Sequence, residues 1–420
     1  MQQKITFSGI VCYNNLIKDR ESDIFMKVVI AIDSFKGSMT SLEAGESAAK
    51  GLRRVYPDAE IVVRPLADGG EGTVRALTKD CGGALTKICV TGPAGHPVEC
   101  EYGILSDGRT AVIEMAGAAG ITLVSGHEKN PLHTTTYGVG EVIRDAIQKG
   151  CRHFIIGIGG SATNDGGIGM LQALGFGLLD ENDRQVCFGA AGLPHIKRIT
   201  TENVLPQLKE CTFRIACDVT NPLCGEKGCS AVFAPQKGAA PESIAQMDKW
   251  LKDFAGLTAS NYPDANPSAE GAGAAGGLGF AFRTFLNASL EPGIRIVLEE
   301  TGLSDSIWEA NLVITGEGRM DAQTAMGKAP MGVAHLAKQW RKPVFAFCGC
   351  ATPDADCCNE AGIDAFFPIL RNEFSLEDAM NRETAMRNMA DTVEQVFRGI
   401  RSYPAIFPAV PLVNRPVNTQ

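Results

Sequence analysis

The chain has 420 residues, more than one hydrophobic core usually supports, so we expect two domains. Its apolar share of 45% and charged share of 21% are typical of a globular enzyme. The net charge of −9 argues against nucleic acid or an anionic membrane as the main partner, and no apolar run approaches the ~20 residues that cross a bilayer. We therefore expect a cytoplasmic chain whose partners are small molecules. Assembly into a homo-oligomer is left open.

Both ends of the chain differ from its middle. Residues 1–25 lack a continuous apolar signal core and predict a disordered lead, and the first convincing strand follows Met26. The tail at 403–420 is rich in proline without periodicity, which predicts an extended segment. Most of the fourteen cysteines stand singly in apolar stretches, so we expect reduced thiols. The spacing around Cys348, Cys350, Cys357 and Cys358 fits structural zinc poorly.

Strands and helices alternate at both ends of the foldable chain. Apolar runs that predict five strands of one parallel sheet lie at 27–32, 61–66, 312–314, 344–347 and 366–370. Short strands separated by glycine turns, which predict antiparallel pairing, lie at 87–90, 98–105 and 110–114. The sequence predicts an α/β fold in which a parallel-sheet domain (26–83 and 290–402) carries an inserted mixed α/β domain (84–289). Within the first part, Thr40 and Glu43 predict a capping box that opens a helix.

The glycine-rich segment 157–167, here called the glycine loop, is the most informative stretch. It lies between an apolar strand and a helical pattern, where glycines let backbone N–H groups approach an anion and a helix N-terminus adds positive charge. Side chains in the loop add hydroxyl, amide and carboxylate groups that suit phosphate or metal. The candidate phosphate-binding residues are Gly159, Gly160, Ser161, Thr163, Asn164, Gly166 and Gly167.

The same loop has two other interpretations. Gly157, Gly159 and Ala162 match the spacing of a dinucleotide fingerprint, with Asp180 or Glu181 at a suitable distance for the ribose. That pattern indicates a nicotinamide-dependent sugar-acid dehydrogenase, and a purely structural turn is the other alternative. A P-loop is excluded at 322–329, because alanine replaces both its first glycine and its hydroxyl residue.

Polar residues cluster where other predicted strands end. These clusters are Asp33, Ser34 and Lys36; Asp68, Gly69, Gly70 and Glu71; Asp218 and Asn221; Lys237; the stretch 271–279; and Glu317, Arg319 and Asp321. Ligands of open α/β sheets bind beyond the carboxyl ends of strands, so we expect these clusters to share one cleft. A turn alone does not require a lysine or arginine beside the acids, which favours a binding site over six unrelated turns.

Six ordered motifs within 26–400 resemble the type I glycerate kinase family. They lie at 33–36, 67–73, 157–167, 216–223, 271–277 and 313–319. The resemblance implies a flavodoxin-like domain with an inserted α/β domain. It also implies ATP-dependent, magnesium-dependent phosphorylation of D-glycerate to 2-phosphoglycerate in organic-acid catabolism. The chain departs from the family in its lead, its tail and the cysteines at 348 and 350.

Roles within the site follow as hypotheses. Asp165 or Asp218 orients or deprotonates the attacking hydroxyl, and Lys36, Lys237 and Arg319 neutralise the glycerate carboxylate or the γ-phosphate. Magnesium binds carboxylates among Asp68, Glu71 and Glu317. A non-catalytic sensor of anionic metabolites is the alternative from another class of protein.

Overall fold

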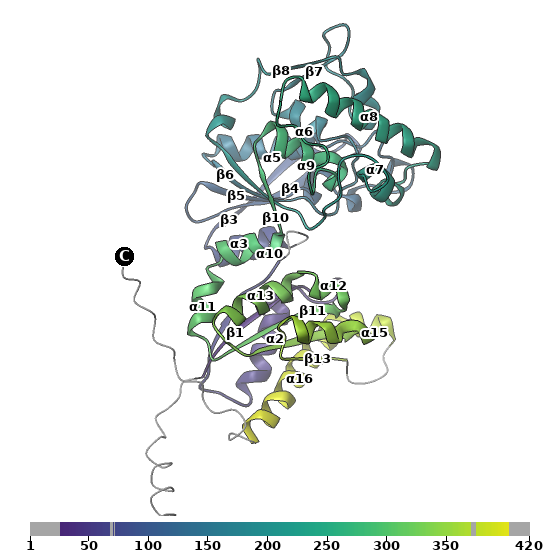
Figure 1. The fold of residues 1–420 in the computed structure, drawn as a ribbon. Coiled ribbons are helices and arrows are strands. Elements are labelled where there is room, and N and C mark those ends of the chain that lie inside the picture. Colours follow the sequence, from purple (N-terminus) through teal and green to yellow (C-terminus); the bar gives the residue numbers. More distant parts are fainter. Residues whose placement is uncertain (1–25, 68–69, 71, 371–374, 403–420) are drawn as a thin grey trace, which may run out of the picture.

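The computed structural model describes residues 26–67, 70, 72–370 and 375–402, and shows two lobes joined by a neck (Figure 1). Each lobe is built on its own sheet. The lower lobe in Figure 1, here called the parallel-sheet lobe, has the strands β1 (Lys27–Ile32), β2 (Glu60–Val63), β11 (Leu312–Met320), β12 (Val344–Ala351) and β13 (Ala365–Pro368). The upper lobe, here called the mixed-sheet lobe, has the strands β3 (Ala84–Thr91), β4 (Pro97–Ile104), β5 (Thr110–Glu114), β6 (His153–Gly157), β9 (Thr212–Ala216) and β10 (Ser289–Glu291).

The strands of the parallel-sheet lobe run in the order β13-β12-β11-β1-β2, and every neighbouring pair is parallel. Counted within this sheet alone, that order is 2-1-3-4-5 read from β2, which defines a flavodoxin-like topology. The predicted fold class is therefore confirmed. The chain changes direction across the sheet between β1 and β11, which makes their carboxyl ends the topological switch point.

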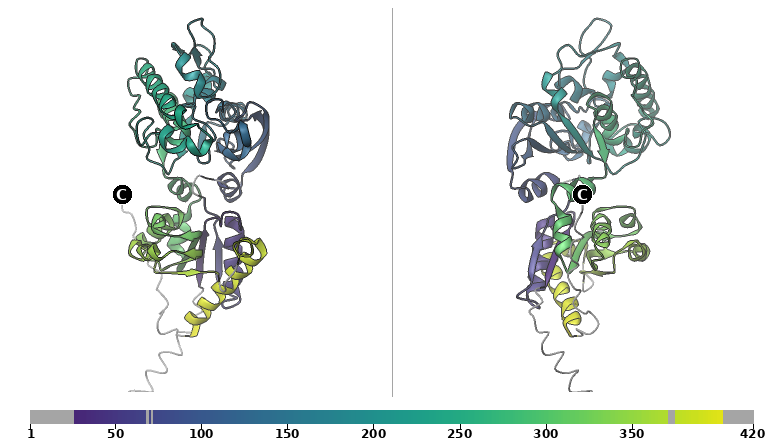
Figure 2. Two further views of the ribbon diagram at one scale, coloured as in Figure 1. Left: turned by 90° about the vertical axis from the view of Figure 1, so that its right-hand side faces the viewer. Right: turned by 60° about the vertical axis from the view of Figure 1, so that its left-hand side comes forward.

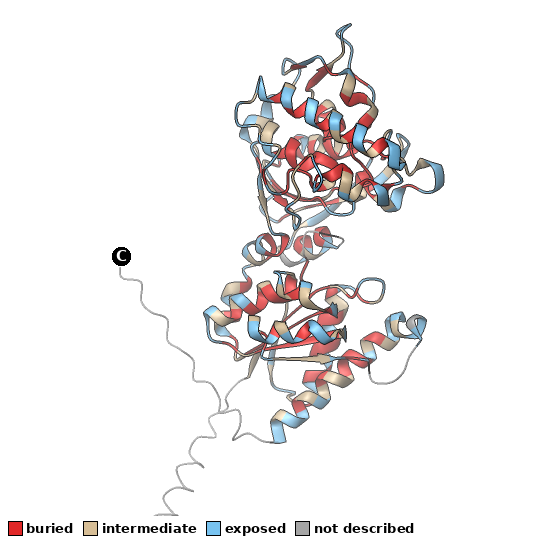
Figure 3. Ribbon diagram, turned by 45° about the vertical axis from the view of Figure 1, so that its right-hand side comes forward, coloured by how far each residue is buried: buried red, intermediate tan, exposed pale blue. Residues whose placement is uncertain are grey.

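Alternating side chains of β1 cover both faces of this sheet. Val28, Ile30 and Ile32 belong to one buried cluster, while Val29 and Ala31 belong to another, as the two-residue period of a strand requires. The first cluster includes residues of α2 (Ser41–Arg53) and α16 (Arg382–Ser402). The second includes residues of α11 (Leu303–Glu309) and α13 (Ala329–Gln339). Figure 3 shows this buried interior in red.

Strand β11 is longer than the sequence indicates. The predicted turn around Glu317 is wrong, because β11 continues to Met320 and pairs with β12, with Arg319 opposite Cys350. The polar residues there have an extended backbone because they pair with β12, which itself continues to Ala351. Glu317 and Arg319 consequently project from the end of a strand.

The mixed-sheet lobe has the strand order β10-β9-β6-β5-β4-β3. Pairing of β3 with β4 and of β4 with β5 is antiparallel, as predicted, and the other three pairs are parallel. A hairpin of β7 (Gly177–Leu179) and β8 (Arg198–Thr200) lies apart from this sheet. The lobe's main helices are α5 (Tyr137–Gln148), α6 (Ile168–Ala173), α7 (Cys229–Phe233), α8 (Pro241–Ala259) and α9 (Ala274–Phe285).

The neck is an apolar layer between the two sheets. It contains α3 (Thr73–Asp80) and α10 (Gly293–Glu300), which lie between the lobes in all three orientations of Figures 1 and 2. Val74 of α3 and Ile294 of α10 belong to a cluster that includes Val112 and Ile155 from one sheet and Val313 from the other. The lobes therefore share one continuous buried core.

The limits of the two domains remain a proposal. The predicted limits separate α3 from β3 and divide β10, whereas α3 contacts β4 and β5, and β10 pairs with β9. We propose that the inserted unit includes α3 and α10 and spans about residues 73–300. The predicted lead (1–25) and tail (403–420) lie outside the described residues.

Two further features hold over the described part of the chain. None of its helices is both long and apolar enough to cross a membrane. No disulfide joins two of the cysteines that the structure describes.

The predicted capping box at the start of α2 is confirmed. The Thr40 hydroxyl accepts a hydrogen bond from the Glu43 N–H at 3.3 Å, and the Glu43 carboxylate accepts one from the Thr40 N–H at 2.9 Å. Replacing Thr40 by alanine is expected to lower the free energy of unfolding by about 1 kcal/mol, measured by urea denaturation. Thr40→Ser, which keeps the hydroxyl, should stay close to wild type. Equal stability of Thr40→Ala and wild type would contradict this role.

Candidate functional site

The loop after β1 lies at the switch point of the parallel sheet. It carries Asp33, which is buried and accepts the Ser34 N–H at 2.7 Å, and the exposed Lys36. This loop rests on the end of β11, where a Cβ atom added to Gly318 would come within 3.4 Å of the Phe35 Cα. The close approach places the backbone of Phe35 and Lys36 beside Gly318, at the position where flavodoxin-like folds bind ligands.

The end of β11 holds a group of charged side chains. Glu317 is 8% exposed and accepts the Thr324 hydroxyl at 2.5 Å. Asp321 caps α12 (Ala322–Ala325) and lies 3.3 Å from the Lys328 ammonium. Arg319 is exposed, with its Nε 3.6 Å from Asp321. Asp321 thus has a capping role, while Arg319 remains accessible to a ligand.

The glycine loop follows β6 in the mixed-sheet lobe. Gly160, Gly166 and Gly167 have φ values of 71°, 63° and 77°, which favour glycine because other residues lack easy access to this region. Gly159 and Gly160 are exposed, while residues 161–167 are buried. The backbone of Gly159 and Gly160 is therefore accessible at the tip of the loop, while the rest of the loop is packed inside the lobe.

A second glycine-rich stretch supports the loop from behind. Ala275, Gly276 and Gly277 all have positive φ, and the Gly276 carbonyl accepts the Gly166 N–H at 2.9 Å. A Cβ atom added to Gly276 would come within 2.1 Å of the Thr163 carbonyl oxygen, so only glycine fits. This contact brings together two of the predicted clusters.

Lys237 lies beneath the glycine loop, at the end of a 3₁₀ helix (Pro235–Lys237). It is 2% exposed, and its ammonium donates to the Ser161 hydroxyl and the Thr163 carbonyl, each at 2.6 Å. Burial lowers the pKa of Lys237 from 10.5 to about 8, while the nearby Cys229 and Asp165 oppose the shift. A positive charge is thus held under the loop at neutral pH.

Asp165 is completely buried, and both of its oxygens accept hydrogen bonds. Oδ2 accepts from the N–H and hydroxyl of Thr136, and Oδ1 accepts from the Gly167 N–H at 3.0 Å. Burial raises the pKa of Asp165, while these hydrogen bonds oppose the increase. These hydrogen bonds join the glycine loop to the start of α5. Asp165 therefore fixes the position of the loop.

The loop after β9 joins the same group. Asp218 is exposed, and its Oδ1 accepts the Gly293 N–H at 3.0 Å, at the start of α10. The Asn221 carbonyl accepts the Gly273 N–H at 2.9 Å, and its side-chain amide donates to the Lys227 carbonyl. Asp218 is therefore an acidic group of this lobe that a ligand can reach, whereas Asp165 is not.

The glycine loop of the mixed-sheet lobe approaches the parallel-sheet lobe near the loop after β2. A Cβ atom added to Gly159 would lie 3.9 Å from the Gly70 Cα, so the glycine loop touches the segment between β2 and α3. The predicted site residues Asp68, Gly69 and Glu71 lie outside the described residues.

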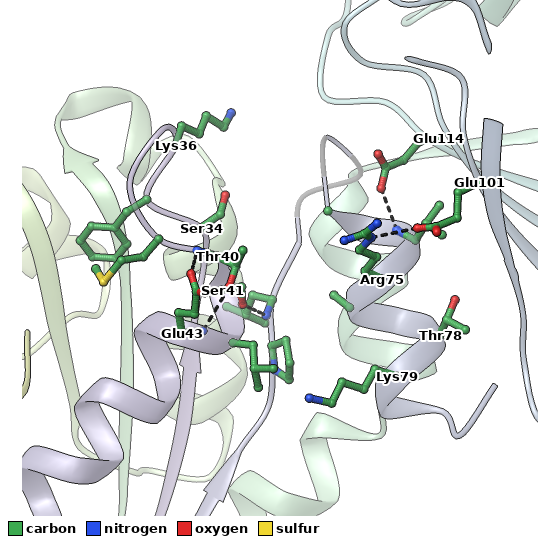
Figure 4. Close-up of a pocket in the computed structure, with 18 of the residues that line it drawn as sticks. Ser34, Lys36, Thr40, Ser41, Glu43, Arg75, Thr78, Lys79, Glu101 and Glu114 are labelled. Carbon is green, nitrogen blue, oxygen red and sulfur yellow. Dashed lines mark hydrogen bonds and ion pairs between the residues drawn. The ribbon is translucent and has the colours of Figure 1, made fainter. Parts of the chain in front are cut away.

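A cleft with a volume of about 1130 Å³ opens between the lobes (Figure 4). Ser34 and Lys36 line one wall, and Glu114, at the end of β5, and Gly117 line the other, so carboxyl ends from both sheets open on it. The cleft residues that sequence reasoning missed are Thr40, Glu43, Arg75, Lys79, Glu101, Glu114 and Arg382. Two of them could have been found in the sequence, because Arg75 and Lys79 are four residues apart and therefore lie on one face of a predicted helix.

In the described ranges, no three histidine, cysteine, aspartate or glutamate side chains lie together in a way that could hold a metal ion. Mg²⁺ in phosphoryl-transfer sites needs only one or two carboxylates besides phosphate oxygens and water. Glu317 lies at the switch point and is the described carboxylate closest to that smaller requirement, although its Oε1 accepts the Thr324 hydroxyl and its Oε2 lies 4.0 Å from the Lys328 ammonium.

Comparison with known proteins agrees with this architecture. The sequence profile of the glycerate kinase family matches residues 28–401. The chain belongs to the glycerate kinase family. It is 48% identical to a glycerate kinase of Haemophilus influenzae, over 89% of this chain and 98% of the relative. It is 45% identical to the glycerate 2-kinase of Escherichia coli, over 88% of this chain and 98% of the relative.

A solved structure shares the fold as well as the sequence. The crystal structure of a candidate glycerate kinase 2 from Salmonella typhimurium LT2 superposes with a TM-score of 0.83 at 43% identity. The similarity covers 90% of this chain and 99% of that chain, so both lobes are included. The predicted membership of the glycerate kinase family is confirmed.

Lys237 provides a test of the buried charge. If its ammonium supports the glycine loop, kinase turnover (kcat/KM) should fall as the pH rises above about 8, where Lys237 loses its proton. The free energy of unfolding should change in the opposite direction to turnover. The unfolded chain binds the Lys237 proton up to about pH 10.5, so this group's contribution to stability should rise between pH 8 and 10.5.

Lys237→Met should turn over more slowly at neutral pH and lack both pH dependences in this window. Lys197→Met, at an exposed lysine of the same lobe, should behave like wild type. An unchanged turnover and pH profile in folded Lys237→Met would contradict the role of this charge.

Proposed function

We propose that this protein transfers the γ-phosphoryl group of ATP to the 2-hydroxyl of D-glycerate, giving 2-phosphoglycerate and ADP in organic-acid catabolism. The observation that carries the proposal is that the family match spans 28–401, and so includes both walls of the cleft. Phosphoryl transfer needs alignment and neutralised charge more than covalent chemistry. Of the predicted site residues, Ser34 and Lys36 line the cleft itself, and the glycine loop approaches it beside Gly70.

The glycine loop supplies the cradle for a phosphoryl group. Its exposed tip at Gly159 and Gly160 allows close backbone contact with an oxyanion. Beneath the tip, the Ser161 hydroxyl accepts a hydrogen bond from Lys237. A hydroxyl that accepts from lysine still has its own proton to donate, so Ser161 is polarised as a donor toward an anion.

The parallel-sheet lobe supplies charge from the opposite side. Lys36 and Arg319 are exposed at the switch point and are the cations we assign to the glycerate carboxylate. Glu317, together with Asp68 and Glu71, would hold Mg²⁺, which supplies charge neutralisation for the phosphate oxygens when bound.

Asp218 is the carboxylate that we assign to the attacking 2-hydroxyl. It is exposed, and its Oδ1 is oriented by the N–H of Gly293. A carboxylate placed in this way can accept the hydroxyl proton as the oxygen attacks phosphorus. Asp165, with both oxygens engaged inside the lobe, is assigned to loop support.

An assay of ADP release distinguishes the candidate functions. With ATP, Mg²⁺ and D-glycerate, ADP should form only when glycerate is present. A change in nicotinamide absorbance would favour the dehydrogenase, and glycerate binding without ADP release would favour the sensor.

Phosphorus NMR of the product then tests the position of transfer. Phosphate on the 2-oxygen couples to a single proton and should give a doublet, whereas phosphate on the 3-oxygen would give a triplet and contradict the proposed product.

Asp218→Asn should lower kcat by about 10²–10⁴-fold with the fold retained, while full turnover in this variant would remove Asp218 from the reaction.

A further inference from the structure

Helix α3 presents two cations to the cleft between the lobes. Arg75 and Lys79 both line the cleft, are exposed, and stand one helical turn apart, about 6 Å along the helix axis. Figure 4 shows α3 across the cleft from the loop that carries Lys36, with the Lys79 side chain directed toward the parallel-sheet lobe. Like charges at this spacing are mildly destabilising in an isolated helix, so stability does not explain them.

The acids of the cleft pair with Arg75 and Arg382 but leave Lys36 and Lys79 without an acidic partner among the described residues. Glu43 pairs with Arg382, Glu101 pairs with Arg75 at 2.8 Å, and Glu114 accepts the Val74 N–H at 2.8 Å. Lys36 and Lys79 make no ion pair with any described residue. Positive charge is therefore left on both walls, in a chain whose net charge is −9.

The size and lining of the cleft indicate the kind of anion. Pockets that hold drug-sized ligands have volumes of about 300–1,000 Å³, and this cleft, at about 1130 Å³, is far larger than a three-carbon acid requires. Apolar residues contribute to the same walls, among them Leu42, Pro65 and Leu85. A polyanion with an apolar portion, such as a nucleoside triphosphate, matches this combination.

We propose that the polyphosphate chain of the nucleotide lies between Lys36 of the parallel-sheet lobe and Arg75 and Lys79 of α3. The spacing of the two α3 cations is comparable to the span of a triphosphate. The amino end of α3 lies beside Gly70, and Gly70 approaches Gly159, so a chain laid along α3 points its terminal phosphate toward the glycine loop. This assignment rests on the proposed kinase function and adds Arg75 and Lys79 as nucleotide-binding residues.

Lys79→Met tests the assignment, with Lys50→Met as the matched control. Lys50 is an exposed lysine of α2 that does not line the cleft. Calorimetric titration without glycerate should show that Lys79→Met weakens ATP binding about tenfold while adenosine binding is unchanged, since the lost charge faces the phosphate chain. In turnover assays, the KM for ATP should rise about tenfold, with kcat and the KM for glycerate within about twofold of wild type.

Two results would overturn the assignment. One is a Lys79→Met enzyme whose KM for glycerate rises while ATP binding is unchanged, which would show that α3 binds glycerate and not the nucleotide. The other is a folded Lys79→Glu variant that binds ATP as tightly as wild type. Failure of the kinase function itself is distinguishable, because wild type would then bind ATP with the same dependence on Lys79 but release no ADP with glycerate.

Discussion

The apolar layer between the two sheets is the constraint on which the rest of the structure depends. Val112 and Ile155 of one sheet and Val29 and Val313 of the other belong to one buried cluster, with α3 and α10 between them. Separating the lobes would expose this layer to water, at about 25 cal/mol for each Å² of apolar surface. The lobes are therefore held with strand ends from both sheets open on a single cleft.

The same layer limits how the lobes can move. Between α10 and α11 the chain passes through Gly302, whose φ is 60° and beside which a Cβ atom would meet nothing within 4 Å. The second connection runs from the end of β2 to the start of α3. Closure of the cleft around a nucleotide would exclude water from the phosphoryl group.

Within the mixed-sheet lobe, the glycine loop gains rigidity from buried charge. Placing Lys237 and Asp165 out of water is unfavourable unless their hydrogen bonds are satisfied. Lys237 donates to Ser161 and Thr163, and Asp165 accepts from Thr136, from the Gly167 N–H of the loop and from the Gly169 N–H of α6. The arrangement fixes the loop before a ligand arrives, so little reorganisation is needed at the moment of transfer.

The sequence could predict the elements of the fold better than their extent or their contacts. Apolar runs and glycine turns identified the parallel sheet and the antiparallel strands, because burial imposes those patterns locally. The extension of β11 past Glu317 depends on pairing with β12, which is distant in the chain and carries no local pattern. Asp165 and Lys237 were recognised as polar residues near glycines, but their burial depends on helices elsewhere. Arg75 and Lys79 were not predicted, because their four-residue spacing indicates one helix face without showing what that face meets in the folded chain.

A crystal structure of the complex with a non-hydrolysable ATP analogue, Mg²⁺ and D-glycerate tests the central claim most directly. The account predicts both ligands in the cleft between the lobes, with the terminal phosphate at the glycine loop and the glycerate carboxylate toward Lys36 and Arg319. Ligands bound on the outer face of one lobe, with the cleft left to solvent, would contradict it.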